Sequence, residues 1–451
     1  MRTAVATLCF ACVLASGCSR NSSRLDYAEY VTEHYGGLVA LRKLEHPELQ
    51  AELARIEAEG GTPAQLDSDP PDARENAAAG LMGLFPLKSV ERLRTEAVEL
   101  VPRERFTHDP FQLERAIQLW QRHAKAWTRA REALDRPAWH SGHVHRSGFF
   151  ADTSFIDTVE LIAWVESCHA AGALAEDDLP AAVTSCQYLL KSAGYLASEQ
   201  HVVSRLTGAR IRRLGLRVAE AITQHPHLKL DHVTAIAETL AMQLANWPAD
   251  ARAWIGDRAL GLHTYEAIRG GDLAWLLTDD ELQSLVADET LPEFEAAVLR
   301  RLDEDELFYL QWMRKVIADC DRPYYRRREL LARMQLAMTE LEDTPRYPLV
   351  AARMLLRDVD TAQREQAADR AACEAWCATL SLAAGITPPA IDRNPVSGGR
   401  YRLTTGPAQA TLTSRGTPLD AWPETIVVPY AQRNLRQDTQ TAGRPESGGR
   451  Q

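Results

Sequence analysis

The spacing of hydrophobic positions predicts a mainly α-helical chain. Between about Asn76 and Ala384, apolar residues recur at intervals of three and four, and period-two alternation is not evident. Segments dense in Gly, Pro and Asp, such as "GGTPAQLDSDPPDARE", separate the periodic stretches and predict loops. A first helix is predicted from Leu38 to Glu59, interrupted near Pro47.

The best-marked unit is a helical hairpin over residues 154–197. Its first arm is apolar most of the way round, which predicts burial on all sides. "AGALAEDDLP" predicts the turn, with Asp178 as a cap and Pro180 at the start of the second arm. Further helices are predicted at about 200–223, 229–246, 291–319, 323–342 and 346–384. Because no regular repeat accompanies them, we expect packed helical hairpins in an irregular α-solenoid or bundle.

Beyond Gly385 the pattern changes to short β-type runs, "RYRLTT", "ATLTS" and "TIVVP", separated by turn residues. The apolar residues of this segment predict that it docks on the helices. The predicted organisation is a leader at 1–17, a tether and N-terminal helix at 18–75, a helical domain at 76–385, an extended segment at 386–430 and a disordered tail at 431–451.

The leader predicts the compartment. "MRTAVATLCFACVLASGC" has one basic residue and a short apolar run, followed by Ala15-Ser16-Gly17-Cys18, which resembles the lipobox of bacterial lipoproteins. The resemblance implies that Cys18 carries diacylglycerol and an amide-linked acyl chain such as palmitate, which together anchor the protein to the membrane. Ser19 favours the outer membrane, and we expect the body to face the periplasm.

Composition narrows the functional classes. Hydrophobic residues make up 45% of the 451 residues, enough for a large core. The formal net charge is −11, and removal of the leader with its single charged residue, Arg2, makes the mature chain more acidic still. A broad nucleic-acid-binding face is therefore disfavoured, and no nucleic-acid partner is predicted.

Five cysteines remain after the leader and Cys18. Cys168 and Cys186 lie at similar heights on the two arms of the hairpin, so either a disulfide or two buried thiols is expected there. Cys373 and Cys377 are one helical turn apart, which is poor geometry for a mutual bond. The pairing of these two and of Cys320 is left open.

Two groups of residues are weak candidates for metal ligands. His140, His143 and His145 lie within six residues of one another in "WHSGHVHRSG", with Asp152 and Asp157 as the nearest downstream carboxylates. Without a spaced fourth ligand, the favoured interpretation is a polar connector between helices. No metal or other cofactor is predicted.

Glu166 and His169 form the Glu-x-x-His spacing of carboxylate-bridged di-iron bundles, but a second copy is not evident. A helix with a polar edge is therefore favoured. Arg326, Arg327 and Arg328 could contact lipid phosphates, although a solvated helix face is the simpler interpretation.

"AAAGLMGLFP" resembles the Gly-Leu-Met loop of lytic transglycosylases. Those enzymes require a Glu-Ser pair before the loop, whereas Glu57 is followed by Ala58, and Glu166-Ser167 comes after the loop. The sequence therefore argues against peptidoglycan cleavage. It predicts a helix, a turn at Gly83 and a second helix that starts at Pro86.

Two weak family likenesses remain. A long helix followed by Asn394-Pro395-Val396-Ser397-Gly398-Gly399 and "RYR" resembles the end of type II secretion pseudopilins. "PPDARENAAAGL", "ALAEDDLPAAV" and "GDRALGLHTYEAIRGGDL" resemble segments of uncharacterised helical envelope lipoproteins of planctomycetes and their relatives. Asn394 stands where the pseudopilin motif has Asp, and the calcium-binding loop is missing, so calcium is not implied. Neither likeness implies an activity.

These observations predict a lipid-anchored envelope protein with a binding or scaffolding role, whose partners are the membrane and possibly another envelope protein. The alternative is a periplasmic enzyme, either metal-dependent through the region of His140, His143 and His145 or directed at peptidoglycan. Convergence of those histidines or Glu166 in one concave pocket would favour the enzyme. The ligand and the oligomeric state are not readable from the sequence.

Overall fold

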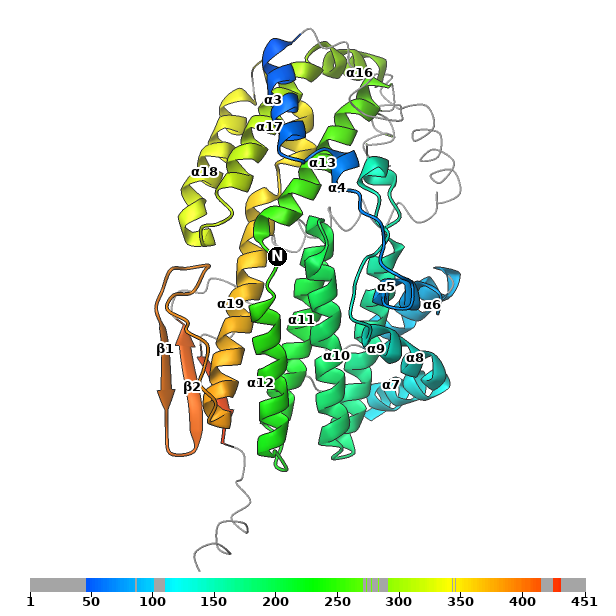
Figure 1. Ribbon diagram of the computed structural model, residues 1–451, viewed down its shortest axis with the longest axis vertical. Helices are drawn as coiled ribbons and strands as arrows, with labels where there is room; N and C mark the ends of the chain where they lie inside the picture. The colour runs from blue at the N-terminus through cyan, green and yellow to red at the C-terminus, as the bar shows by residue number, and fades with distance from the viewer. Residues whose placement is uncertain are drawn as a thin grey trace, which may run out of the picture.

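The computed structural model describes residues 46–85, 87–100, 110–270, 291–342, 346–414 and 425–430, together with residues 273, 277, 283 and 344. Within these residues the protein is mainly α-helical, with a small sheet near the C-terminal end (Figure 1). This confirms the predicted fold class. The leader, Cys18 and the tail after residue 430 lie outside the described residues.

Short helices form the N-terminal part: α3 (Pro47–Ala58), α4 (Pro63–Leu66), α5 (Ala77–Met82), α6 (Leu87–Val98), α7 (Pro110–Arg122), α8 (Ala124–Leu134) and the 3-10 segment η2 (His145–Phe150). The stretch that resembled a transglycosylase loop is α5, the turn at Gly83 and the start of α6, as predicted. The side chain of Asn76 caps α5 by accepting the backbone N–H of Ala78. Helix α3 packs on the later helix α17.

The predicted hairpin is helices α9 (Ser154–Ala175) and α10 (Leu179–Ser198). Residues on every side of α9 are buried, which confirms its expected position inside the molecule. Asp177 turns the chain with a φ of 60°, and the side chain of Asp178 accepts the backbone N–H of Ala181 to cap α10. Helices α11 (Val202–Thr223), α12 (Leu230–Ala245) and α13 (Asp250–Arg269) follow.

Two of the predicted long helices are broken. The stretch 291–319 contains α16 (Leu291–Arg300) and α17 (Leu302–Ala318), and 346–384 contains the π-helical turn η3 (Ala351–Leu355) and α19 (Val359–Ala384). The buried carboxylate of Asp305 on α17 accepts the backbone N–H groups of Val350 and Ala351, so η3 is held by a side chain from another helix. Helix α18 (Tyr324–Leu341) agrees with its predicted range.

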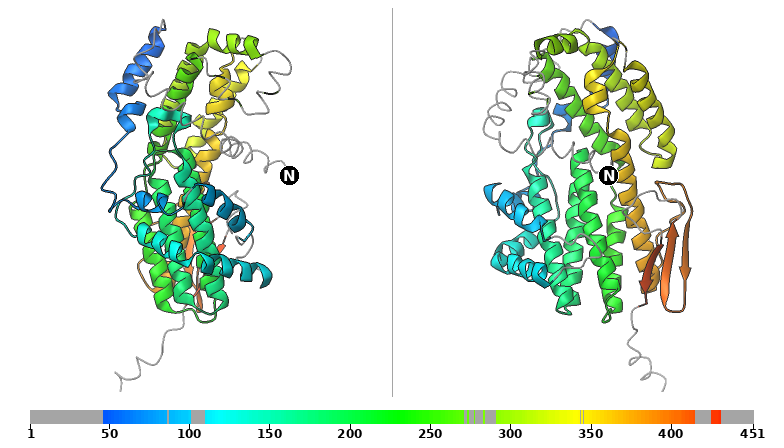
Figure 2. Two further views of the ribbon diagram at one scale, coloured as in Figure 1. Left: turned by 90° about the vertical axis from the view of Figure 1, so that its right-hand side faces the viewer. Right: turned by 180° about the vertical axis from the view of Figure 1, so that it is seen from behind.

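The C-terminal strands form an antiparallel sheet in the order β1 (Tyr401–Thr405), β2 (Gln409–Ser414) and β3 (Thr425–Pro429). The sheet packs against α19 (Figures 1 and 2). Alternate residues of β2 and β3 enter the same hydrophobic core as α19: Ala410, Leu412, Ile426 and Val428. The predicted docking of this segment on the helices is therefore confirmed for the described strands.

The buried apolar residues form two clusters. One contains residues of α5 to α12, the second half of α19 and the sheet. The other contains residues of α3, α13, α17, α18 and the first half of α19. Helix α19 therefore runs through both cores. In Figure 1 the first cluster lies in the lower part of the molecule and the second in the upper part.

All five described cysteines are buried free thiols. The disulfide that was one of two expectations for the hairpin is not formed, because the two sulfurs face different neighbours. The thiol of Cys168 donates to the backbone carbonyl of Leu100, and that of Cys186 to the carbonyl of Gly215, at 3.6 and 3.3 Å. Both act as small apolar side chains.

Among the helices of the described residues, none combines the length and the apolar character that crossing a bilayer requires.

Candidate functional site

The histidine-rich connector between α8 and α9 contributes to two separate places. His140 lies near the surface, where its Nε2 is 3.1 Å from both the hydroxyl and the backbone carbonyl oxygen of Ser68. His143 and His145 are buried, with 8% and 6% of their surface exposed. The structure therefore brings His143 and His145 together, whereas His140 lies apart from them.

The third member of the buried group is His201, which precedes the first residue of α11 and is 7% exposed. The ring of His143 lies between the other two, with ring centroids 4.9 Å from His145 and 5.3 Å from His201. We call these three residues the histidine cluster. His201 is more than 50 residues away from the other two in sequence, and it was not singled out from the sequence.

Asp67 holds the histidine cluster against the N-terminal segment. Its Oδ1 accepts the backbone N–H of His145 at 2.6 Å and lies 3.4 Å from the Nδ1 of that residue. Its Oδ2 accepts the Nε–H of Arg146 at 2.7 Å. The Asp67 carboxylate thus binds both the connector backbone at His145 and the positively charged side chain of Arg146.

Burial favours the neutral forms of His143 and His201. Burial is the main cause that lowers the pKa of His143 to about 4, and His145 lowers it further, against the opposing effect of Asp67 and Asp152. Burial, followed by the neighbouring rings of His143 and His145, lowers the pKa of His201 to about 3. Protonation of His143 or His201 is therefore opposed by burial and by the neighbouring imidazoles.

His263 on α13 lies against the end of the same connector. A side chain at Gly148, whose φ is 55°, would overlap the His263 ring. Burial lowers the pKa of His263 to about 4. Within the described part of the chain, no three His, Cys, Asp or Glu side chains are arranged to hold a metal ion.

Glu166 and His169 also have partners within the helices. Arg131 forms a bidentate pair with Glu166, with both nitrogen–oxygen distances at 2.7 Å. The Nδ1 of His169 lies 2.8 Å from the Ser185 hydroxyl oxygen, and burial, with Arg131 second, lowers its pKa to about 4. The His169 ring packs on Trp120 at a centroid distance of 3.9 Å.

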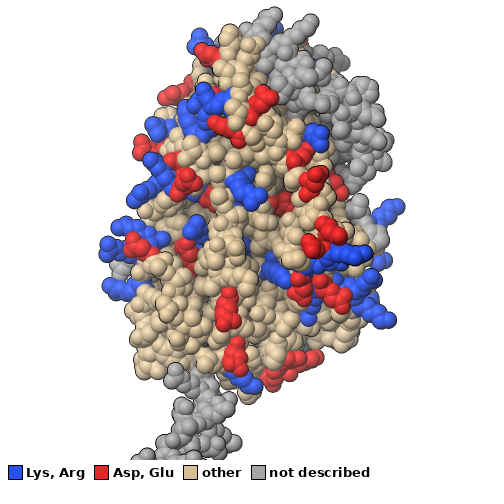
Figure 3. Space-filling model, in the orientation of Figure 1, with Lys and Arg blue, Asp and Glu red and all other residues tan. Residues whose placement is uncertain are grey.

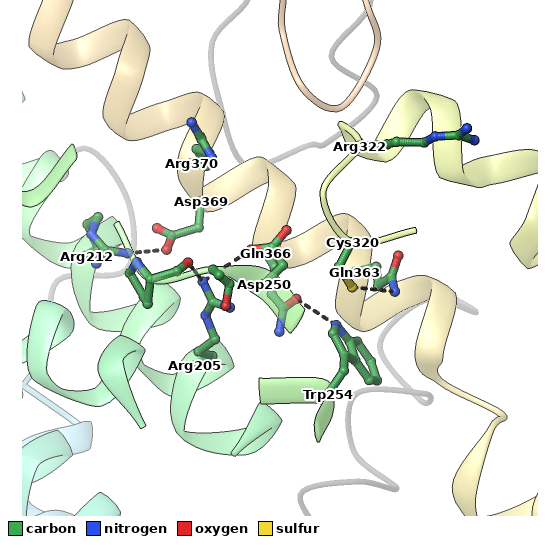
Figure 4. A network of polar contacts seen from close by, with 12 residues as sticks. Arg205, Arg212, Asp250, Trp254, Cys320, Arg322, Gln363, Gln366, Asp369 and Arg370 are labelled. Atoms are coloured by element: carbon green, nitrogen blue, oxygen red, sulfur yellow. Dashed lines mark hydrogen bonds and ion pairs between the residues drawn. The ribbon is translucent and has the colours of Figure 1, made fainter. Parts of the chain in front are cut away.

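A second polar group separates the two hydrophobic cores. Arg212 on α11 pairs with Asp369 on α19 and packs over the ring of Trp247, 4.6 Å from its centroid. Its Nε also donates to Gln243 at 2.9 Å. Figure 4 shows this pair beside Arg205. Arg212 and Asp369 are both buried, with 1% and 8% of their surface exposed.

The same layer continues to α18 through Asp250. Its carboxylate lies 3.2 Å from Arg205 and 2.7 Å from Arg327. The prediction that Arg326, Arg327 and Arg328 form a solvated run is therefore wrong for Arg327, which is 4% exposed, and correct for the two residues beside it. This layer was not predictable from the sequence, because each member looks like an ordinary charged residue of a helix.

The surface carries shallow hollows rather than a deep pocket in the described part of the chain. One lies between α17 and α18, has a volume of about 300 Å³ and is lined mainly by charged residues: Lys315, Asp319, Arg322, Arg326, Glu329 and Arg333, with Ala318 and Leu330. Another, of about 290 Å³, lies where the ends of α17 and α18 meet the residues before η3. Neither contains a residue of the histidine cluster or Glu166.

Comparisons with protein-family models, curated proteins and solved structures found no match. The likenesses to pseudopilins and to planctomycete lipoproteins therefore rest on the sequence motifs alone. What the geometry offers chemically is a set of buried imidazoles, two buried arginine–carboxylate groups and a basic surface hollow.

Proposed function

We propose that this protein is a lipid-anchored component of the bacterial envelope, attached to the outer membrane and facing the periplasm, with a binding or scaffolding role. The motif Ala15-Ser16-Gly17-Cys18 after a short apolar run supports the anchor. The placement of the candidate catalytic groups carries the choice of binding over catalysis. Glu166 is paired with Arg131, and the histidine cluster is buried away from both hollows.

The anchor is tested by Cys18→Ala. Without its acylated cysteine, the protein should move from the membrane fraction to the soluble fraction, because the remaining chain would lose its lipid chains. Fractionation followed by immunoblotting measures this. If the variant stays in the membrane pellet after a salt wash, another segment provides the attachment and the proposal fails.

An envelope enzyme is the competing proposal, because His143, His145 and His201 share one cluster. A catalytic imidazole must be reached by water and substrate. Labelling of the folded protein with diethyl pyrocarbonate separates the two proposals, with His140 as the accessible control in the same connector. Labelling of His140 without labelling of the histidine cluster supports binding. Labelling of His143 at a similar rate supports the enzyme.

A further inference from the structure

The hollow between α17 and α18 differs from the rest of this acidic chain in its charge. Its lining contains four basic and two acidic side chains. Arg322 and Asp319 lie 3.1 Å apart and neutralise each other. Lys315, Arg326 and Arg333 form no ion pair with the described residues, so their positive charges are exposed to solvent and to any ligand.

Aromatic rings position two of these cations. The ammonium of Lys315 lies 4.1 Å from the ring centroid of Trp312, and the guanidinium of Arg326 lies 5.7 Å from that of Tyr325. Arg326 and Arg333 are two turns apart on α18, so they project from the same side of the helix. Figure 3 shows basic side chains along the α18 side of the molecule, with acidic ones between them.

The hollow also lies next to the point where the chain enters the described structure. Helix α3, the first described helix, packs on α17, and Glu52 of α3 pairs with Arg314 at 2.9 Å. About 27 residues separate Cys18 from this helix, a length that can span at most about 95 Å. This length is sufficient for the α17–α18 side to reach a bilayer to which Cys18 is anchored.

We propose that this hollow docks the helical body on an anionic phospholipid surface, with Lys315, Arg326 and Arg333 contacting lipid phosphates. Arginine binds phosphate oxygens through two parallel N–H groups. Trp and Tyr side chains, such as Trp312 and Tyr325, are enriched in the headgroup region of membranes. Leu336, 55% exposed on α18, adds an apolar contact. The proposal extends the proposed envelope function, but the contact itself does not depend on acylation.

The test uses the chain from residue 18 onward with Cys18→Ala, so that no acyl group contributes. Its binding to vesicles of phosphatidylcholine with 30% phosphatidylglycerol is compared with its binding to pure phosphatidylcholine by co-sedimentation. We expect binding to the anionic vesicles only, weakened by salt because the contact is electrostatic. Arg326→Gln/Arg333→Gln should weaken it roughly 30-fold, as two basic contacts are lost.

The matched control is Lys125→Gln/Arg129→Gln, which removes two exposed cations one turn apart on α8, far from the hollow in Figure 1. It should bind like the parent, and both variants should melt like the parent. Equal binding to the two vesicle types, no binding, or equal losses in the two variants would overturn the proposal. The last result would mean that only net charge matters. These results are independent of Cys18→Ala fractionation in cells, so the two proposals can fail separately.

Discussion

At the scale of single residues, the buried histidines are the most unusual feature of this protein. An imidazole ionises near neutral pH, and burying its charged form costs a large desolvation free energy. His143 packs between His145 and His201, and the lowered pKa values of His143 and His201 show that the fold favours the neutral forms.

This cluster predicts loss of stability in mild acid. The pKa of His143 is about 6.5 in the unfolded chain and about 4 in the folded one, so between these values the unfolded chain binds a proton that the folded chain does not. The free energy of unfolding therefore falls as the pH decreases from about 6.5 towards 4. From pH 7 to pH 5, His143 alone should contribute a loss of about 2 kcal/mol.

Urea unfolding of the parent and of His143→Gln at pH 7 and pH 5 measures this loss. Gln cannot be protonated in this range, so the variant should lose less stability on acidification than the parent. Equal pH dependence in the parent and His143→Gln would show that this ring does not resist protonation.

At the scale of elements, close helix packing depends on a few small residues. Gly208 lies on α11 where it meets α10, and a Cβ atom there would lie 2.8 Å from the carbonyl oxygen of Ala193. Gly194 on α10 is also helical, but a Cβ atom there would have 3.6 Å to its nearest neighbour, a side-chain nitrogen of Gln243. Both glycines are therefore helical, but only Gly194 has room for a Cβ atom.

Replacement of each glycine by Ala should therefore give opposite results. Ala favours the helix over Gly by about 1 kcal/mol, which should appear as a gain in Gly194→Ala. In Gly208→Ala the overpacking cost of about 1–3 kcal/mol should exceed that gain, because a backbone carbonyl cannot move aside cheaply. Thermal melts of the two variants provide the comparison. A Gly208→Ala protein more stable than the parent would mean that the helices are not packed this closely.

The same scale shows what the sequence could predict. Hairpin α9–α10 was predicted within one or two residues because its periodicity, cap and proline all agree. Helix α13 was not singled out, since its buried face includes Arg258, His263 and two glycines rather than an apolar stripe. The π-helical turn η3 is held at its start by Asp305, which precedes Val350 by 45 residues in sequence. Local patterns cannot contain such contacts.

The histidines of the candidate site show the same limit of local sequence patterns. The three histidines of the connector were weak candidates for one shared site, and a polar connector was the favoured interpretation. The structure brings the rings of His143 and His145 together, whereas the side chain of His140 faces Ser68. His201 and Asp67 join the group only through tertiary packing, so neither could be predicted from one sequence.

At the scale of the whole molecule, α19 connects two hydrophobic cores, and a polar layer lies where they meet (Figure 4). Arg212 and Asp369 are central to that layer. Burial raises the pKa of Asp369, and Arg212 is the strongest opposing influence. Because Arg212 opposes the effect of burial on this carboxyl group, the two residues should be energetically dependent on each other.

Removal of one partner should cost much more than removal of both. Arg212→Met leaves a buried carboxylate without its nearest cation, and we expect a loss of about 3–5 kcal/mol in the free energy of unfolding. Arg212→Met/Asp369→Leu removes both charges and should recover most of that loss. Calorimetric melts at one pH and salt concentration would give the order parent, double variant, single variant.

A surface pair on the same helix provides the matched control for this prediction. Arg370 and Glu374 lie 2.9 Å apart on α19, but the Arg370 side chain is 52% exposed, so water screens the charges and Arg370→Met should cost less than about 1 kcal/mol. Similar losses in Arg370→Met and Arg212→Met would show that burial adds nothing to the inner pair. A double variant no more stable than Arg212→Met would show that Asp369 does not depend on Arg212. The expected order instead makes the Arg212–Asp369 pair a constraint on how the two cores fit together along α19, because neither charge can be left in the layer without the other.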